Sequence, residues 1–403
     1  MQRRQFLKLT TVLAATASAE PQGADGASVV VAGAGIIGAS IAFHLAKAGA
    51  RVTIIDQAAP ATHASRGTFA WINATWAKQP RHYHRLNQDS IRAWHELEKE
   101  LDIPVAWGGS LEWFADEQRQ DRLAEQIAEQ AWWGEPASIL NVTAVNRIEP
   151  ELRFIGANRA AHSGNDGAVD PVLATQRLLD AAQALGAQMS YPSKLLGARF
   201  DAKRLKSLET SAGVLKADKL VLATGAAAAL PGVIAGIDIP QRTTPGVIAI
   251  TEPRSRILHG VVAAPGVHMH QRSDGRFVIG EQAGAPDTHL ERLAARPNAF
   301  PTMGLAQEHG QRLLGAATRF VPALARTEIE HTYIGWRPLP LDGHPVLGAA
   351  PSRPDVYLAI THSGVTLAPL IGRLAARELL GESLEEQLRL YRPTREFSRV
   401  QRY

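Results

Sequence analysis

The part of the sequence that most constrains the fold is a glycine-rich turn between two apolar runs. Residues 28–32 form a short β-branched run, GAGIIG occupies residues 33–38, a helical pattern follows as far as Gly49, and a second apolar run ends at Asp56. Short continuous apolar runs of this kind are typical of buried parallel strands. The order of strand, glycine turn, helix, strand and acid is typical of a dinucleotide-binding βαβ unit, so it predicts an α/β fold.

Each part of this unit has a physical role in nucleotide binding. Gly33 permits the tight turn out of the strand, Gly35 lets a pyrophosphate approach the backbone, and Gly38 lets the helix pack against the strand. The first turn of the helix presents free N–H groups and a partial positive charge to the phosphates. Asp56 is placed to accept hydrogen bonds from a ribose hydroxyl and disfavours a 2′-phosphate. The predicted cofactor contacts are therefore Gly33, Gly35, Ile36, Ile37, Gly38 and Asp56.

Composition excludes several classes of function. With 403 residues, 45% of them hydrophobic, the chain is long enough for one large or two interleaved domains. No apolar run reaches the roughly 18–20 residues of a membrane span, so no integral membrane segment is predicted. The net charge of +4 comes mainly from the first 19 residues and no dense Lys/Arg cluster follows, so nucleic acid is not an expected partner. The absence of cysteine excludes a thiolate nucleophile, a Cys-ligated metal and a Cys-linked flavin, and no metal site is predicted.

The first 19 residues have the pattern of an export signal. Arg3 and Arg4 precede Gln-Phe-Leu-Lys, a short apolar stretch follows, and Ala17-Ser18-Ala19 offers small residues to a signal peptidase. This arrangement resembles the twin-arginine motif, which directs the export of proteins that are already folded. It predicts a signal peptide at 1–19, a linker at 20–27 and a periplasmic protein. The alternative is an amphipathic N-terminal helix that packs on the protein or stays disordered.

Four further segments extend the pattern beyond the nucleotide-binding unit. They are THASRG at 62–67, GAVDP at 167–171, ADKLVLATG at 217–225, and GWRPLPLDGHPVLG at 335–348 with the loop THSG at 361–364 behind it. In this order and spacing, the chain resembles the D-amino-acid oxidase superfamily of FAD-dependent oxidoreductases from about residue 28 to residue 390. The superfamily includes glycine oxidase, sarcosine oxidase and D-amino-acid dehydrogenase. The glycine motif alone does not separate NAD from FAD, and the resemblance favours FAD.

The resemblance implies a Rossmann-type FAD-binding domain interleaved with a substrate domain that is built on a mainly antiparallel sheet. The FAD-binding domain would comprise 28–90, 160–232 and 330–395, and the substrate domain 91–159 and 233–329. FAD would be bound non-covalently, because there is no cysteine and the loop at 62–68 lacks the Trp-His pair that some relatives use for a histidyl link. The implied cofactor contacts outside the glycine motif are Ser65, Thr224, Gly225, Ser363 and Gly364.

The resemblance also implies the chemistry of the site. In this superfamily the flavin takes a hydride at N5 from a carbon that bears an amine, and the resulting imine hydrolyses. Arg337, in the Gly-x-Arg-Pro motif at 335–338, would bind a substrate carboxylate through its planar guanidinium, unless it forms a structural salt bridge. His362, in the loop near the flavin, and His268, on a predicted strand, would line the pocket or serve as ordinary core or surface residues. No nucleophilic triad is expected.

Three functions remain open at this point. The first is oxidation of an amino acid or an N-alkyl amino acid, the second is action of the same fold on another amine or a hydroxy acid, and the third is a flavin-binding redox partner without turnover. The electron acceptor would be O₂, a quinone or a soluble acceptor. The strand at 276–280, which we match to the one that carries a lysine near N5 in sarcosine oxidases, has no lysine. This difference argues against an oxidase of that branch.

Overall fold

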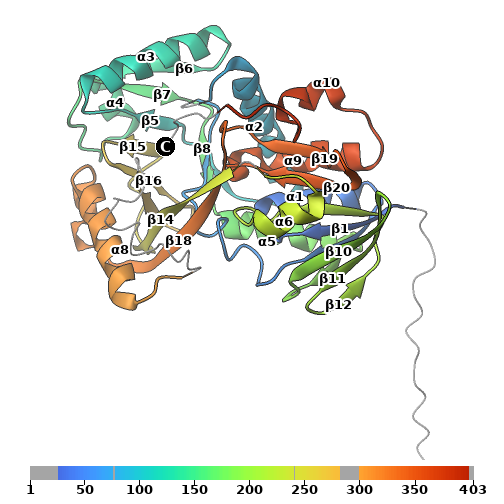
Figure 1. Ribbon diagram of the computed structural model, residues 1–403. Coiled ribbons are helices and arrows are strands. Elements are labelled where there is room, and N and C mark those ends of the chain that lie inside the picture. The colour runs from blue at the N-terminus through green and yellow to red at the C-terminus, as the bar shows by residue number, and fades with distance from the viewer. Residues whose placement is uncertain (1–25, 76–77, 240, 282–298, 399–403) are drawn as a thin grey trace, which may run out of the picture.

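Two large β-sheets form the frame of the molecule, one in each of two lobes (Figure 1). The structure is a computed structural model in which residues 26–75, 78–239, 241–281 and 299–398 are described. The predicted signal peptide at 1–19 and most of the predicted linker therefore lie outside the described residues. The two sheets confirm the predicted α/β fold with a Rossmann-type part.

The first sheet has six strands in the order β19-β20-β13-β1-β2-β9. Its strands are β1 (Ser28–Ala32), β2 (Arg51–Ile55), β9 (Gln188–Ser190), β13 (Lys219–Leu222), β19 (Val346–Ala350) and β20 (Arg353–Ile360). Neighbouring strands are parallel except at the edge, where β19 runs antiparallel to β20. Parallel neighbours need long crossover connections, and helices supply several of them.

The side chains of β1 alternate between two covered faces. Val29 and Val31 pack among the helices, whereas Val30 and Ala32 pack against a second layer on the other side of the sheet. The helices are α1 (Ile36–Lys47), α2 (Arg81–Leu101), α5 (Pro171–Ala184) and α9 (Gly364–Leu379). The second layer consists of β10 (Leu195–Asp201), β11 (Arg204–Thr210), β12 (Gly213–Leu215) and α6 (Ala229–Ala235). Because both faces are covered, β1 has a continuous apolar sequence rather than an alternating one.

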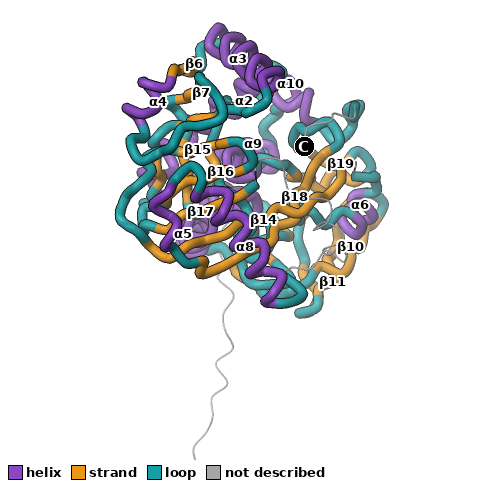
Figure 2. Tube along the Cα trace, turned by 90° about the vertical axis from the view of Figure 1, so that its left-hand side faces the viewer, coloured by secondary structure: helices purple, strands orange, loops and turns teal. Residues whose placement is uncertain are grey.

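The second large sheet has eight strands in the order β18-β14-β17-β16-β15-β5-β7-β6. Its strands are β5 (Ser110–Glu112), β6 (Ala137–Asn141), β7 (Arg159–Ser163), β14 (Gln241–Pro253), β15 (Val261–Ala264), β16 (Val267–Gln271), β17 (Arg276–Gly280) and β18 (Ile329–Pro340). Neighbours are antiparallel except β15 and β5, so the predicted mainly antiparallel sheet is confirmed. Helix α8 (Met303–Thr318) covers β14, β16, β17 and β18, as Figure 2 shows.

Shorter elements connect and flank the two sheets. A three-stranded sheet consists of β3 (Trp71–Ile72), β8 (Gly167–Val169) and β4 (Val105–Ala106). The remaining helices of the described residues are α3 (Glu117–Trp132), α4 (Val142–Ile148), η1 (Pro322–Arg326), α10 (Glu385–Leu388) and η2 (Arg389–Tyr391). Of these, α3 and α4 pack beside β6 and β7 at the edge of the eight-stranded sheet.

One strand lies across the boundary that the sequence suggested at residue 330. β18 pairs with β14 from Pro340, opposite Gln241, to Ile329, opposite Thr251, so it belongs to the eight-stranded sheet. From the sequence, we expected residues 330–340 to belong to the FAD-binding domain and Ile329 to the substrate domain. The carboxyl end of β18 leads directly into β19 of the six-stranded sheet. The strand therefore joins the two sheets, and a single boundary residue does not describe it.

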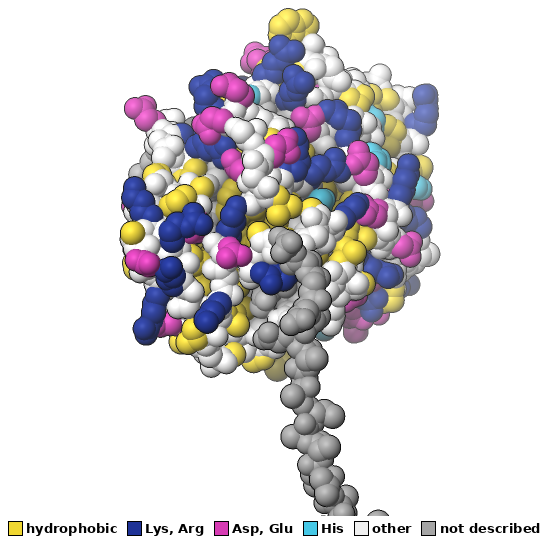
Figure 3. All heavy atoms as spheres, turned by 90° about the vertical axis from the view of Figure 1, so that its right-hand side faces the viewer, with side chains coloured by type: hydrophobic (Ala, Val, Ile, Leu, Met, Phe, Trp, Pro, Cys, Tyr) yellow, Lys and Arg dark blue, Asp and Glu magenta, His cyan; other side chains and the backbone are white. Residues whose placement is uncertain are grey.

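The surface carries charges of both signs. On the face that Figure 3 shows, Lys and Arg side chains are interspersed with Asp and Glu side chains. That face therefore lacks the dense basic patch typical of nucleic-acid binders. Among the residues that the structure describes, no helix combines the length and the apolar character needed to cross a membrane.

Candidate cofactor and substrate site

A cavity of about 980 Å³ lies at the carboxyl ends of β1, β2, β13 and β20. Its wall includes the glycine turn after β1, the loop after β2, the turn between β13 and α6, part of β18, and the turn between β20 and α9. In α/β sheets, ligands bind outside the carboxyl ends of the strands. The volume is at the upper end of the range for small-molecule and cofactor sites. The cavity therefore joins the predicted nucleotide-binding turn to the eight-stranded sheet.

Backbone crowding at the turn after β1 explains two of the glycines. Gly33 has a φ of +116°, a left-handed conformation that favours glycine. A Cβ on Gly33 would lie 2.3 Å from the carbonyl oxygen of Ala223. A Cβ on Gly38 would lie 1.8 Å from the carbonyl oxygen of Gly33. The absence of a side chain at Gly33 therefore lets the turn pass close to the end of β13, and its absence at Gly38 lets helix α1 pack against the turn after β1.

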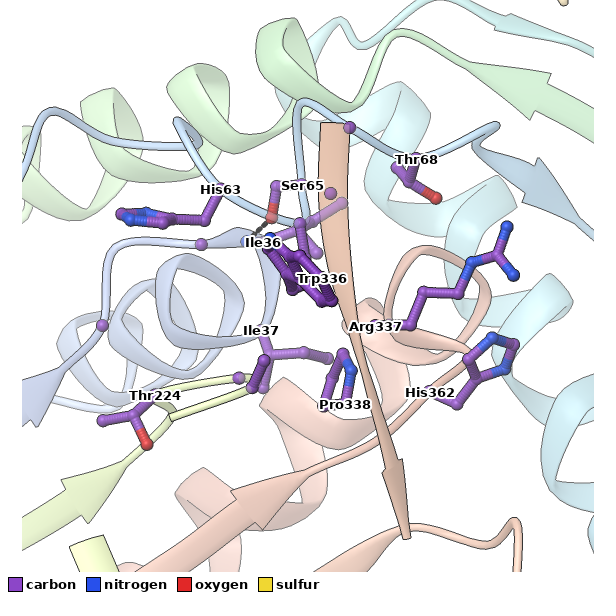
Figure 4. A pocket seen from close by; sticks show the side chains of 18 of the residues that line it. Ile36, Ile37, His63, Ser65, Thr68, Thr224, Trp336, Arg337, Pro338 and His362 are labelled. Atoms are coloured by element: carbon purple, nitrogen blue, oxygen red, sulfur yellow. Dashed lines mark hydrogen bonds between the residues drawn. The ribbon is translucent and has the colours of Figure 1, made fainter. Parts of the chain in front are cut away.

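The N-terminus of α1 faces the loop that follows β2. Gly35 is the N-cap of α1 and has no side chain with which to cap the helix. The Ser65 hydroxyl accepts a hydrogen bond from the Ile36 amide at 3.0 Å (Figure 4). Gly35, Ile36, Ile37 and Ser65 all line the cavity. The loop is thus held against the helix end at which a phosphate would be stabilised.

Asp56 is held by backbone N–H groups at the carboxyl end of β2. Its Oδ2 accepts a hydrogen bond from the amide of Ala34 at 2.8 Å, and its Oδ1 accepts one from the amide of Ala58 at 2.9 Å. An ionised carboxylate offers about four lone-pair sites. Asp56 lines the cavity, so its remaining lone pairs are available to ribose hydroxyls, while the two amides fix its orientation.

The turn after β13 forms another part of the wall. Gly225 has a φ of +57°, and a Cβ there would meet no atom within 4 Å. The Thr224 hydroxyl donates a hydrogen bond to the carbonyl of Ala227 at 2.9 Å. Thr224 and Gly225 line the cavity, as do Ser363 and Gly364 at the start of α9. Segments far apart in the sequence therefore meet around one space, in the arrangement that the resemblance implied.

Buried polar atoms along the wall fit a large polar ligand. Among the described residues, atoms of this kind with no hydrogen-bond partner include His63 Nε2, Asn73 Oδ1, Ser193 Oγ, Gln241 Oε1, Thr243 Oγ1 and Thr361 Oγ1. All of these residues line the cavity. Buried polar groups in folded proteins are nearly always hydrogen-bonded, so these atoms are expected to bond to a ligand or to water. FAD carries hydroxyl, phosphate and ring groups along its whole length, and the residues present fit it.

The loop after β2 crosses β18 at a pair of glycines. A Cβ on Gly67 would lie 2.4 Å from the amide nitrogen of Gly335, and a Cβ on Gly335 would lie 2.6 Å from the carbonyl oxygen of Gly67. Trp336, the residue after Gly335, and Ile36, at the start of α1, both line the cavity and are labelled in Figure 4. Arg337, the next residue of β18, lines the cavity. The two glycines therefore bring the eight-stranded sheet against the nucleotide end of the site.

The guanidinium of Arg337 lies against the backbone of the neighbouring strand. A Cβ on Gly246 of β14 would be 2.8 Å from Nε and 2.9 Å from Nη2 of Arg337. The side chain points toward the same part of the cavity as His362 (Figure 4). A planar guanidinium in such a position can bind a carboxylate through two parallel hydrogen bonds. Gly246 thus leaves room for the group that the sequence singled out.

His268 and His362 are neutral at physiological pH. Burial, and then the positive charge of Arg337, lower the pKa of His268 to about 3. Desolvation and several nearby cations, Arg337 first among them, lower the pKa of His362 to about 3. The ring of His268 packs against Phe69 and Trp71, with centroid distances of 5.3 and 5.9 Å. Both imidazoles can donate or accept hydrogen bonds, but neither adds a charge to the site.

Three cationic residues in the cavity wall belong to no predicted site, and they are Lys78, Lys194 and Arg242. The charges of Lys78 and Arg242 contribute to the low pKa of His362. Thr244 lies opposite Arg337 in the β14–β18 pair. Arg242 therefore projects from the same face as Arg337, because side chains alternate along a strand. None of these cations belongs to a recognisable motif, and the sheet register that reveals Arg242 cannot be read from the sequence.

A buried acid lies behind one wall of the cavity. Asp166 is fully buried and accepts hydrogen bonds from Trp71 Nε1 at 3.0 Å, Thr75 Oγ1 at 3.1 Å and Ser110 Oγ at 2.7 Å. Burial raises the pKa of Asp166 to about 7, against the effect of these hydrogen bonds. Trp71 lines the cavity. Asp166 therefore fixes a wall residue and joins β3 and the residues after it to the eight-stranded sheet.

Known proteins share this architecture. Residues 28–378 match the family described as FAD dependent oxidoreductase (DAO). The chain belongs to this family. It is 26% identical over 362 residues to the glycine oxidase of Geobacillus kaustophilus, which covers 86% of this chain and 91% of that protein. It is also 27% identical over 383 residues to the uncharacterized oxidoreductase YurR of Bacillus subtilis (strain 168), with coverage of 91% and 98%.

Solved structures agree with the family assignment. The crystal structure of glycine oxidase from Geobacillus kaustophilus has a TM-score of 0.82 at 25% identity, and the match covers 92% of this chain and 99% of that one. The structure of iminodiacetate oxidase from Chelativorans sp. BNC1 has a TM-score of 0.74 at 25% identity, with coverage of 91% and 98%. The protein is therefore an FAD-dependent oxidoreductase of the DAO family, and FAD is its cofactor.

Proposed function

We propose that this DAO-family enzyme oxidises the carbon–nitrogen bond of an amino acid or an N-alkyl amino acid to an imine, which then hydrolyses to a carbonyl compound and an amine. The observation that carries the proposal is the guanidinium of Arg337, held over Gly246 in the wall of the cofactor cavity. Two similar proteins are named for glycine and iminodiacetate. Both compounds carry an amine close to a carboxylate, which supports the proposal.

Arg337 would fix the substrate through its carboxylate. A bidentate guanidinium–carboxylate pair sets both a distance and a direction, so the carbon next to nitrogen is presented in one orientation. FAD, when bound, supplies the two-electron acceptor for the C–H bond of that carbon. The neutral imidazoles of His268 and His362 offer hydrogen bonds to the substrate without competing for its carboxylate. Trp71, tied to Asp166, closes part of the wall and helps to exclude water.

Anaerobic reduction of the flavin tests the proposed reaction. The purified holoenzyme would be mixed with D- and L-amino acids, glycine, sarcosine, simple amines and hydroxy acids, and the visible flavin absorbance followed. Bleaching by an amine that carries a carboxylate is the expected result. Reduction by a hydroxy acid or a simple amine alone would support the second reading, and no reduction by any compound would support a redox partner without turnover. Reoxidation by O₂, a quinone or a soluble acceptor then identifies the acceptor.

We also propose that residues 1–19 direct folded export to the periplasm. The support is the sequence itself, in which Arg3 and Arg4 precede Phe-Leu-Lys and a short apolar stretch. Replacing both arginines with lysine should retain the enzyme in the cytoplasm, which cell fractionation would detect. Unchanged delivery to the periplasm would contradict this proposal without affecting the one about the reaction.

A further inference from the structure

Lys78 is a buried cation in the segment before α2, and its amino group reaches the start of α9. Its side chain is 7% exposed, and its Nζ donates a hydrogen bond to the Ser363 hydroxyl oxygen at 2.8 Å. The same oxygen accepts a second hydrogen bond, from the Tyr83 hydroxyl at 3.0 Å. The ammonium group also lies 5.5 Å from the centre of the Tyr83 ring, a favourable position for a cation. Two elements, α2 and the turn before α9, therefore fix the position of the charge.

The hydroxyl of Ser363 is committed to this arrangement. Ser363 is the N-cap of α9, yet its side chain makes no capping hydrogen bond to the helix. A hydroxyl oxygen has two lone pairs, and Lys78 and Tyr83 donate to this oxygen. A serine at an N-cap usually stabilises the helix by accepting from one of its first amides. Here it instead holds a lysine beside the positive end of the helix.

This charge faces the cofactor cavity. Lys78, Ser363 and Gly364 all line it. The charge of Lys78 also contributes to the low pKa of His362, so it acts on the interior of the cavity. Holding an ammonium group in such a site costs hydration energy. An anion bound in the cavity can offset this cost. Reduction of FAD adds a negative charge to the flavin ring.

We propose that Lys78 stabilises the reduced anionic form of the bound FAD and thereby raises the reduction potential of the cofactor. The balanced step is FAD + 2 e⁻ + H⁺ → FADH⁻, in which one negative charge is added to the ring system. The amine substrate supplies the electrons and the proton together as a hydride during turnover, and a chemical reductant supplies the electrons in the test. The proposal concerns the cofactor, so it does not depend on the identity of the substrate.

The expected magnitude follows from the Coulomb effect of a single charge. A nearby opposite charge typically changes the pKa of an ionised group by about one to three units, which changes the stability of the ionised form by roughly tenfold to a thousandfold. Removal of the Lys78 charge should therefore lower the equilibrium constant for two-electron reduction by at least about tenfold. For a two-electron couple, a tenfold change is about 30 mV. A change of this size is readily measured against a reference dye.

Two substitutions separate charge from hydrogen bonding. Lys78→Gln removes the charge but keeps a donor for Ser363, whereas Lys78→Met removes both. The control is Lys206→Met. Lys206 is an exposed lysine on β11, outside the cavity, and its ion-pair partner is Asp201. The midpoint potential of each holoprotein would be measured without substrate, by slow reduction in the presence of a dye. We expect both Lys78 variants to have a lower potential than wild type, and Lys206→Met to match wild type.

Several outcomes would overturn the proposal. A wild-type potential in Lys78→Gln would show that the charge does not set the potential; an altered potential in Lys78→Met alone would assign the effect to hydrogen bonding. A loss of bound FAD from both Lys78 variants would give the lysine a structural role instead. An equal shift in Lys206→Met would show that the effect is not local to the cavity. Because no substrate is added, these outcomes are independent of whether the proposed amine oxidation is correct.

Discussion

The two ends of the cavity are built in different ways. At the nucleotide end, Gly33, Gly35, Asp56 and Ser65 lie within one βαβ unit and its following loop, and their hydrogen bonds join residues close together in the sequence. At the substrate end, Arg337 packs over Gly246, which comes from a different part of the chain. The first end is a local motif and the second is a product of strand pairing. Damage to the first should therefore affect cofactor binding, and damage to the second should affect the substrate.

The largest effect is expected at the nucleotide end. In Gly38→Ala, the new Cβ would lie 1.8 Å from the carbonyl oxygen of Gly33, and both are constrained by the backbone. Helix α1 must move away from β1, so the variant should lose most of its FAD or fail to fold. The flavin-to-protein absorbance ratio measures this loss. The matched control is Gly315→Ala in α8, where a Cβ meets no atom within 4 Å and FAD should be retained.

The next largest effect is expected at the substrate end. Arg337→Ala should keep FAD and the fold, but loss of a charge-assisted bidentate pair typically costs about 2–5 kcal/mol. This corresponds to a decrease of roughly 30-fold to several thousandfold in the rate constant of flavin reduction divided by the dissociation constant of a carboxylate substrate. Arg337→Lys should recover part of it, because an ammonium keeps the charge but loses the planar fork. Loss of FAD from Arg337→Ala would instead make the residue structural.

A smaller effect is expected when Arg337 is displaced rather than removed. In Gly246→Ala, the new Cβ would lie 2.8 Å from Arg337 Nε, so the guanidinium must shift. A misplacement of about 1 Å can cost on the order of a hundredfold in rate. The flexible end of the arginine side chain can relieve part of this displacement, so a smaller loss is expected. We expect the kcat/KM of Gly246→Ala to lie between that of wild type and that of Arg337→Ala. In the double variant, Gly246→Ala should add nothing to Arg337→Ala; additive losses would show that Gly246 acts elsewhere.

The smallest effect on activity is expected from substitution of Asp166, which lies behind the cavity wall between the two ends. This substitution should instead change how the stability depends on pH. Asp166 has a pKa raised to about 7. Between the ordinary pKa of an aspartate and pH 7, the folded protein binds the proton and the unfolded chain does not. The stability contributed by this group therefore falls as the pH rises through that window. Asp166→Asn cannot titrate, so its stability should decline less steeply with pH than that of wild type.

Urea unfolding of both holoproteins from pH 5 to pH 8 would measure this difference. Asn can keep the acceptor that faces Trp71, Thr75 and Ser110, because Ser163, at 3.3 Å from the other carboxylate oxygen, can accept instead of donate. The neighbouring acid Glu135, whose pKa burial also raises, remains in both proteins. Parallel stability curves for wild type and Asp166→Asn would contradict a raised pKa for Asp166.

The same contrast explains what the sequence could predict. The fold class and a dinucleotide cofactor followed from motifs whose residues are close in sequence, such as Gly33 and Asp56, because local spacing fixes their geometry. The choice of FAD over NAD followed instead from the resemblance of segments spread along the whole chain. Arg337 was found because it lies in a short Gly-x-Arg-Pro motif. Gly246 was not, because its role depends on the register between β14 and β18. Lys78 was not found either, because its contact with Ser363 joins segments that only the folded chain brings together.

The central claim is that Arg337 selects a carboxylate-bearing amine for oxidation. The most direct test compares the rate of anaerobic flavin reduction by an amino acid with the rate for its decarboxylated amine, in wild type and in Arg337→Ala. We predict that wild type prefers the amino acid by a factor of at least about 30, as expected for a bidentate charge-assisted pair. In Arg337→Ala this preference should fall to near one, with the amine reacting equally in both proteins. A preference that survives unchanged in Arg337→Ala, with FAD still bound, would contradict the claim.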